Sequence, residues 1–260
     1  MSQAAEERDA VERHFARSIL ALPTVTPEAP HGDGERGRQP ASAAPADGQR
    51  ARPAERPDPA AAVRAGSSLT GARCLELFDA QLASRHLDLA ARWLRSRNAG
   101  FYTIGSSGHE GNAALAAALR PGDPALLHYR SCAFYLVRAA QATPPRDGVG
   151  DVLLGLAAAA AEPIAGGRHK VLGHADLNVI PVTSTIASHL PRAVGLAFSL
   201  GRAGRLGSAV PWPGDAIVLA SAGDASINHS TAAGALNTAA TQPGGPALLS
   251  RRRLRPCRRL

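Results

Sequence analysis

Residues Ala216 to Ala240 read AIVLASAGDASINHSTAAGALNTAA, which is the most informative part of the sequence for the fold. Its first six residues, 216–221, form the short apolar run that is typical of a buried parallel strand. Gly223 and Asp224 then form a turn, after which the chain favours a helix. A carboxylate at such a strand end can bind Mg2+, while the N–H groups of the next helix face a phosphate. A Gly-Asp turn is more often only structural, so its meaning depends on the rest of the chain.

Helical and strand-like patterns alternate on the amino-terminal side of this stretch. Helical spacing of Leu75, Phe78, Leu82, Leu89 and Trp93 predicts a first helix, which ends at 97–100. We expect further helices over 109–119, 130–140 and 149–162, a strand over 125–129, a loop over 164–180, and a helix capped by 183–185 that reaches Leu200. The alternation predicts an α/β fold with a parallel sheet, in which ligands bind beyond the carboxyl ends of the strands.

Both ends of the chain differ from this central pattern. Residues 1–66 are rich in Ala, Pro and Arg, and we expect a disordered arm because they cannot bury enough apolar surface. Within the arm, helical spacing predicts a short helix over 6–22. We expect the folded domain over 67–242, followed by an aberrant Arg-rich tail over 243–260 for which no packing is plausible.

Composition limits the classes of function. The formal charge of +8 comes mainly from six arginines in the last ten residues, so the body is nearly neutral and a nucleic-acid partner is not expected. The three cysteines lie far apart, which predicts neither a disulfide framework nor a zinc site. There is no apolar run of membrane-spanning length and no secretory signal, so we expect no membrane partner and a cytoplasmic location.

Three segments, taken in order, resemble one family. They are FYTIGSSGHEGNAALAAALRPGD (101–123) with HYRS (128–131), HADLNVIPVTSTIASHLPRAVG (174–195), and GDAS (223–226) with ALNTAA (235–240). They look like the α subunit of thiamine-diphosphate-dependent 2-oxo acid dehydrogenases, the E1 component, and most resemble its branched-chain, 2-oxoisovalerate type. The resemblance covers roughly residues 70 to 242 and implies the parallel-sheet thiamine-diphosphate-binding fold.

This resemblance implies an activity and its partners. The chain would act as the α part of an E1 component, which decarboxylates a 2-oxo acid with thiamine diphosphate and Mg2+. The acyl group would pass to a lipoyl-bearing E2 acyltransferase. An E1 β subunit, or a fused β half, would supply the glutamate that activates the cofactor. Related enzymes such as acetoin dehydrogenase share these motifs, so the 2-oxo acid stays open, with the branched-chain type favoured.

The resemblance also implies roles for particular residues. The cofactor-binding set is Tyr129, Arg130, Ser184, Ile186, Gly223, Asp224, Ala225 and Ser226, with Asp224 as the Mg2+ ligand and His174 as the catalytic residue. An arginine beside a diphosphate forms a charged clamp. Without the resemblance, Tyr129 would be a core tyrosine, Ser184 a helix cap and His174 a structural histidine. The remaining candidates near the pocket are Tyr102, His109, Glu110, His128 and His189.

Two departures from the family pattern stand out. Ala225 occupies a position where the family has Gly, and its methyl group limits how closely backbone approaches a phosphate. After Asp224 the family also continues to a strand ending in a metal-binding Asn, where this chain reads TQPGGPALLSRRRLRPCRRL. We therefore expect the next strand to be missing, with a frameshift near Leu249, and we expect the chain alone to decarboxylate nothing. The alternative is a non-catalytic truncated remnant that keeps the fold only.

Overall fold

The computed structural model describes residues 58–168, 171–241 and 247–251. In chain order its elements are α2 (Gly71–Ser96), α3 (Asn112–Ala118), β1 (Ala125–Leu126), α4 (Cys132–Gln141), α5 (Gly148–Leu156), a 3-10 helix (Ala175–Leu177), α6 (His189–Ala203), β2 (Val218–Ala222), a second 3-10 helix (Asp224–Asn228), α7 (Ser230–Thr241) and β3 (Ala247–Arg251). The helix expected over 6–22 lies outside the described residues, as does most of the arm over 1–66.

The three strands form one parallel sheet in the order β1-β2-β3. Ala125 of β1 is the register partner of Leu219 in β2, and Leu219 is in turn the partner of Leu248 in β3. Val179 forms an isolated parallel bridge with Ala125 on the other side of β1. Four chain segments therefore run side by side in the same direction.

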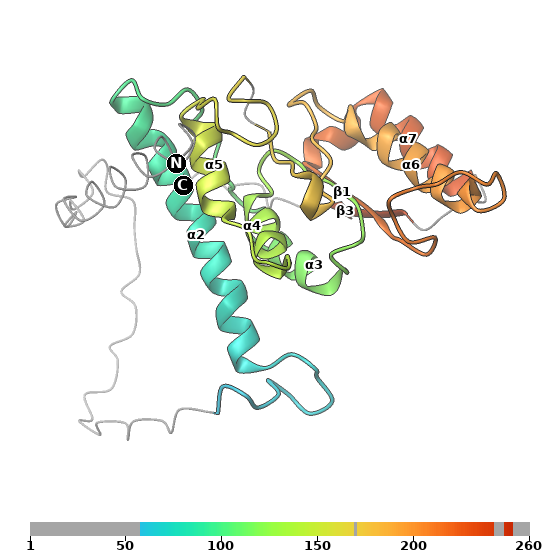
Figure 1. Ribbon diagram of the computed structural model, residues 1–260, viewed down its shortest axis with the longest axis horizontal. Helices are drawn as coiled ribbons and strands as arrows, with labels where there is room; N and C mark the ends of the chain where they lie inside the picture. The colour runs from blue at the N-terminus through green and yellow to red at the C-terminus, as the bar shows by residue number, and fades with distance from the viewer. Residues whose placement is uncertain (1–57, 169–170, 242–246, 252–260) are drawn as a thin grey trace, which may run out of the picture.

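Helices cover both faces of the sheet. Ala125, Leu127 and Leu219 belong to a core cluster shared with α2, α3, α4 and α5. Leu126 and Val218, which point the other way, belong to a second cluster shared with α6 and α7. This alternation follows from the strand's period of two, and burial on both faces explains why these strands are continuously apolar. Figure 1 shows the two groups of helices on opposite sides of the strands.

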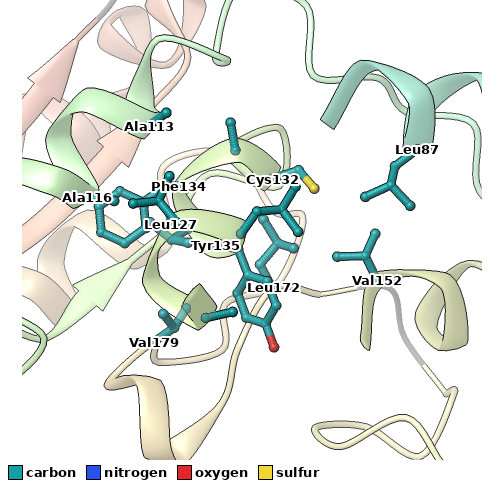
Figure 2. Close-up of a cluster of buried hydrophobic side chains, with 14 of the residues drawn as sticks. Leu87, Ala113, Ala116, Leu127, Cys132, Phe134, Tyr135, Val152, Leu172 and Val179 are labelled. Atoms are coloured by element: carbon teal, nitrogen blue, oxygen red, sulfur yellow. The ribbon is translucent and has the colours of Figure 1, made fainter. Parts of the chain in front are cut away.

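The larger core cluster centres on α4, whose residues 132–139 are all buried. Phe134 and Tyr135 are its largest apolar side chains, and Figure 2 shows Tyr135 beside Leu172 and Phe134 beside Ala116. The Tyr135 hydroxyl donates to the Asp151 carboxylate of α5 at 2.8 Å, so the polar end of this buried ring is satisfied. The core thus joins α2–α5 to the sheet through one buried helix.

The predicted α/β class is confirmed at this coarse level, and the alternation of helices with strands is present. Several predicted boundaries are wrong. The strand expected over 125–129 ends at Leu126, and the helix expected over 149–162 ends at Leu156, where Ala158 takes a left-handed φ of 52°. After Asp224 the chain first makes a 3-10 helix, and α7 begins only at Ser230. No helix among the described residues is long and apolar enough to cross a membrane.

The expectation that no strand follows Asp224 is also wrong. Residues 247–251 form β3, which pairs with β2 along its whole length from Val218↔Ala247 to Ala222↔Arg251. Backbone hydrogen bonding to the edge of β2 orders this segment, and such pairing does not depend on the period of the side chains. The last residue of this strand is Arg251.

Candidate functional site

The candidate site is the carboxyl edge of the parallel sheet. Val179, Ala125 and Leu219 stand in one register row, and all three segments run from that row toward the same edge. The residues that follow them include Ser184, Tyr129 and Gly223 respectively. Three predicted binding segments, far apart in the chain, therefore leave the sheet on the same side, where open α/β sheets bind ligands.

His128 joins Tyr129 to the Gly223 turn. The His128 ring lies 3.9 Å from the Tyr129 ring, centroid to centroid. A Cβ added to Gly223 would lie 3.4 Å from Nε2 of the same ring. The backbone N–H of His128 also donates to Oγ of Ser221 at 2.7 Å. The ends of β1 and β2 are thus held in direct contact.

Arg130 lies half-buried on the same edge. Its Nη1 donates to the carbonyl of Gly105, and its guanidinium stands 5.5 Å from the Tyr129 ring. Its backbone N–H donates to Nδ1 of His128 at 3.2 Å. Arg130 is therefore oriented by two neighbours while it keeps the planar group that recognises phosphate oxygens.

A buried polar cluster lies beneath this edge. Oγ of Ser131 stands 3.0 Å from Oγ of Ser221 and 3.4 Å from Nδ1 of His109, and it accepts a hydrogen bond from the Asn112 amide at 2.9 Å. The His109 ring stacks on the His128 ring with centroids 4.5 Å apart. All five residues are buried. Since buried polar groups are stable only when they are hydrogen-bonded, the cluster fixes how β1, β2 and α3 meet.

His189 ties α6 to the same edge. Its ring Nε2 lies 2.7 Å from the carbonyl oxygen of Ser221, so the Nε2–H form is the one that donates there. Nδ1 of this buried ring has no hydrogen-bond partner within the described part of the chain. Burial, followed by the nearby Arg192, lowers the pKa of His189 despite the hydrogen bond to Ser221. The ring is therefore neutral, and its hydrogen bond joins α6 to the end of β2.

The buried histidines predict a loss of stability in acid. Burial, together with the charges of His109, His189 and Arg130, lowers the pKa of His128 from its ordinary 6.5 to about 3. Below pH 6.5 the unfolded chain binds a proton that the folded chain does not, so stability falls as pH decreases from 6.5 toward 3. For His128 alone we expect a loss of about 2 kcal/mol between pH 7 and pH 5.

Urea unfolding at the two pH values measures this effect. His128→Asn should lose about 2 kcal/mol less than the wild-type chain over the same interval. The exposed His86→Asn is the matched control for replacing a histidine by asparagine. If the stability of wild type and of His128→Asn changes equally with pH, His128 takes up its proton as readily in the folded chain as in the unfolded chain.

The Gly223–Ser226 turn presents one carboxylate. Asp224 is half-buried, and its Oδ1 accepts a hydrogen bond from the backbone N–H of Ala225 at 2.9 Å. The N–H of Ser226 donates to the carbonyl of Gly223, and Ser226 itself is buried. The Asp224 carboxylate thus occupies the backbone N–H of Ala225, one of the groups expected to face a phosphate.

Ser184 and Ile186 lie in an exposed turn before α6. The predicted cap at 183–185 is wrong, since the helix begins at His189 with Ser188 as its N-cap residue. Ala187 has a left-handed φ of 62°, and Oγ of Ser188 donates back to the carbonyl of Thr185, so the turn is closed by its own side chains. Ile186 is 54% exposed, which leaves an aliphatic side chain uncovered in this turn.

His174 is placed in a separate turn. Its ring Nδ1 accepts a hydrogen bond from the N–H of Asp176, and its backbone pairs with Val179. These described contacts belong to its own turn rather than to the buried polar cluster. The Glu110 carboxylate accepts a hydrogen bond from the Ser106 hydroxyl at 3.2 Å and pairs with Arg85 at 3.5 Å. Tyr102 packs against the core.

Sequence reasoning missed three members of the polar cluster, Asn112, Ser131 and Ser221. Ser221 offered a signal, because a hydroxyl within an apolar strand needs a buried partner. Asn112 was similarly conspicuous as the one amide in the alanine-rich helix over 112–118. Their pairing required the tertiary structure, since Ser131 and Ser221 are 90 residues apart.

The described residues suit a cation that is bound partly by the protein and partly by a ligand, rather than by protein side chains alone. Among them no group of three or more His, Cys, Asp or Glu side chains is arranged to hold a metal. Asp224 supplies one carboxylate at this edge, so a cation bound to it would take its other oxygens from a phosphate and water, as Mg2+ commonly does. Such a donor set fits a metal-bound diphosphate.

A separate groove between α6 and α7 has a volume of about 600 Å3. Its lining is mostly apolar, as at Val194 and Phe198, and the hydroxyls of Thr231 and Thr238 are its polar side-chain groups. The carboxyl edge therefore remains the candidate site. In comparisons with known proteins, neither a family model nor a curated protein matches the chain.

Proposed function

We propose that the chain is the α part of a thiamine-diphosphate-dependent E1 component that acts on a 2-oxo acid, with the branched-chain type favoured. One observation carries the proposal: the parallel register directs the segments of Tyr129, Ser184 and Gly223 to the same edge of the sheet. Sequence motifs that resemble one family in order therefore also converge in space. The proposal includes a cytoplasmic location, an E1 β partner and a lipoyl-bearing E2 acyltransferase.

The residues of the edge take distinct roles in this proposal. Arg130 binds the diphosphate, since a guanidinium pairs with phosphate oxygens in a bidentate manner. Asp224 holds Mg2+ through its carboxylate, and Ile186 gives the cofactor an apolar surface to rest on. When bound, thiamine diphosphate supplies the carbanion chemistry that releases carbon dioxide from a 2-oxo acid. Tyr129 and His128 keep Arg130 and the Gly223 turn in place.

Calorimetric titration of the 260-residue chain with thiamine diphosphate and Mg2+ tests the proposal. We expect weak binding that requires Mg2+, because Asp224 is the one carboxylate assigned to the ion. Asp224→Asn should weaken binding by about tenfold or more, since it removes a charged ligand from the cation. Arg130→Ala should weaken it by a similar factor.

Asp215→Asn is the matched control for Asp224→Asn. Asp215 precedes β2 at the amino edge of the same strand, where it pairs with Arg120 at 2.9 Å and is largely exposed. We expect this variant to bind the cofactor like the wild-type chain. Failure of the wild-type chain to bind at all would favour the non-catalytic remnant over the proposed function. Equal binding by Asp224→Asn and wild type would show that the assigned edge is wrong.

A further inference from the structure

The carboxylate of Asp88 holds the loop that precedes α3. Asp88 lies on α2 and is only 7% exposed. Both of its oxygens lie 2.9 Å from the backbone nitrogen of Ser106, and the Ser106 hydroxyl donates to Oδ2 at 2.7 Å. Arg85, three residues earlier on α2, pairs with the same carboxylate at 2.9 Å. Because a buried carboxylate is stable only when it is paired and hydrogen-bonded, these contacts fix the loop at Ser106.

Gly105 brings the loop backbone close to this carboxylate. A Cβ added to Gly105 would lie 3.1 Å from Oδ2 of Asp88 and 3.2 Å from its Cγ. The φ of Gly105 is outside the left-handed region, so the close approach to Asp88, rather than the backbone conformation, favours glycine here. The position of the loop therefore depends on the fit between Gly105 and the Asp88 carboxylate.

The same glycine holds Arg130. The Gly105 carbonyl accepts a hydrogen bond from Nη1 of Arg130 at 2.5 Å, and the guanidinium carbon stands 5.5 Å from the Tyr129 ring. A guanidinium has five N–H donors in one plane, so a hydrogen bond at one of them orients the whole group. A continuous series of contacts thus runs from Asp88 through residues 105–106 to Arg130.

We infer that Asp88 is a positioning residue for Arg130 and acts through the loop backbone at 105–106. Without the carboxylate, the N–H of Ser106 loses its acceptor, and the neighbouring carbonyl no longer has a fixed place from which to hold the guanidinium. An arginine that is oriented in advance loses less conformational entropy when it pairs with phosphate oxygens. The diphosphate as the ligand of Arg130 rests on the proposed function, whereas the link between Asp88 and Arg130 rests on these contacts.

Nitrogen-15 NMR of the Arg130 guanidinium in the full chain tests this link without any cofactor. Arg130→Lys identifies the signal, because it removes only this guanidinium. In the wild-type chain the bond to Gly105 should slow rotation about the Nε–Cζ bond, and Asp88→Ala should speed this rotation by about tenfold. Asp88→Asn keeps one acceptor oxygen for Ser106 and should give an intermediate rate. An unchanged rotation rate in Asp88→Ala would overturn the inference.

The matched control for Asp88→Asn is Asp123→Asn. Asp123 is also a buried carboxylate that accepts backbone N–H groups, from Arg120 and Ile217, but it lies at the amino edge of the sheet. This variant should leave the rotation of the Arg130 guanidinium unchanged. Equally fast rotation in Asp123→Asn and Asp88→Asn would show that general loss of stability, and not the position of the loop, controls Arg130.

Gly105→Ala tests the same link without removing a charge. Its methyl group would press against the Asp88 carboxylate, so the loop must shift and the rotation rate of Arg130 should rise as it does in Asp88→Ala. Gly122→Ala is the matched control, because a Cβ there would meet only the Pro213 ring, at 3.7 Å. It should rotate like wild type. Equal rates in the two alanine variants would contradict the role of the loop.

Calorimetric titration with inorganic pyrophosphate and Mg2+ tests the consequence for binding. Asp88→Ala should weaken binding by about tenfold, and a chain with both Asp88→Ala and Arg130→Ala should bind no more weakly than Arg130→Ala alone. Additive losses would show that Asp88 does not act through Arg130. Absence of binding by the wild-type chain would contradict the proposed function, while the NMR measurement would still decide whether Asp88 positions Arg130.

Discussion

Replacing Arg138 with Ala should lower the free energy of unfolding by about 3–5 kcal/mol, among the largest effects of any single change in the chain. Arg138 lies on α4 and is fully buried. Its Nη1 donates to the carbonyls of Pro121, Asp123 and Leu177 at 2.9–3.2 Å. One guanidinium nitrogen therefore holds the turn before β1 and the 3-10 helix before Val179.

The buried charge of Arg138 faces carbonyl oxygens and is also stabilised by the Asp123 carboxylate. Burial lowers the pKa of Arg138 to about 10, and the Asp123 carboxylate offsets part of that decrease. The side chain remains charged at neutral pH, with its guanidinium 5.1 Å from the Phe134 ring. Nε and Nη2 lack hydrogen-bond partners within the described part of the chain, so the burial of this charge is only partly compensated.

Chemical denaturation of two variants at position 138 separates the cost of a cavity from the cost of losing the guanidinium. Both variants remove the buried charge and the hydrogen bonds to Asp123 and Leu177, while the Pro121 carbonyl keeps the amide of Asn178 as a donor. Arg138→Ala also opens a cavity, which Arg138→Met largely fills. We expect Arg138→Met to lose only about 1–2 kcal/mol. Arg192→Ala, an exposed change on α6, should stay within about 0.5 kcal/mol of wild type. Equal losses for the Ala and Met variants would show that cavity formation is not important here.

Gly167→Ala should destabilise the chain by about 3–4 kcal/mol. Gly167 has a left-handed φ of 72°, and a Cβ at this position would lie 2.3 Å from the carbonyl carbon and oxygen of Ala158. These are backbone atoms, so the loop itself must move. The loop is held by the buried Glu162 carboxylate, which accepts the N–H groups of Ile164, Ala165 and Gly167.

Gly207→Ala is the matched control. Gly207 has a similar φ of 61°, but a Cβ there would meet nothing within 4 Å. It should therefore lose only about 1–2 kcal/mol, which is the energy of the left-handed conformation alone. Urea denaturation followed by circular dichroism gives both values. If the two variants lose the same stability, the clash with Ala158 is relieved without strain.

Helical periodicity predicted the existence of α2 but not its orientation. Leu75, Phe78, Leu82 and Leu89 led to the correct helix, and yet they lie in solvent while Leu77 and Leu87 enter the core. A pattern with two apolar rows predicts a helix equally well from either row. Which row is buried depends on contacts with α3, α4 and α5, which are distant in the sequence.

For the candidate site, too, some features could be predicted from the sequence and others could not. The run at 216–221 and the Gly223-Asp224 turn were local signals, and both lie where the pattern placed them, with the strand running from Val218 to Ala222. The shift of α6 to His189 was not predictable, because the left-handed backbone of Ala187 has no signature in a residue that favours helix. The strand at 247–251 was missed because its stability comes from pairing with β2 rather than from its own pattern.

Elements with a strong local signal could be predicted from the amino-acid sequence: the apolar strand, its acidic turn and the alternation that makes an α/β protein. The meeting of His109, His128 and His189 with Ser131 and Ser221 beneath one sheet edge is visible only in the folded chain. The difference lies in the range of the interactions. Apolar period and turn chemistry act over a few residues, whereas a buried hydrogen bond is formed only when the whole chain brings its two partners out of water.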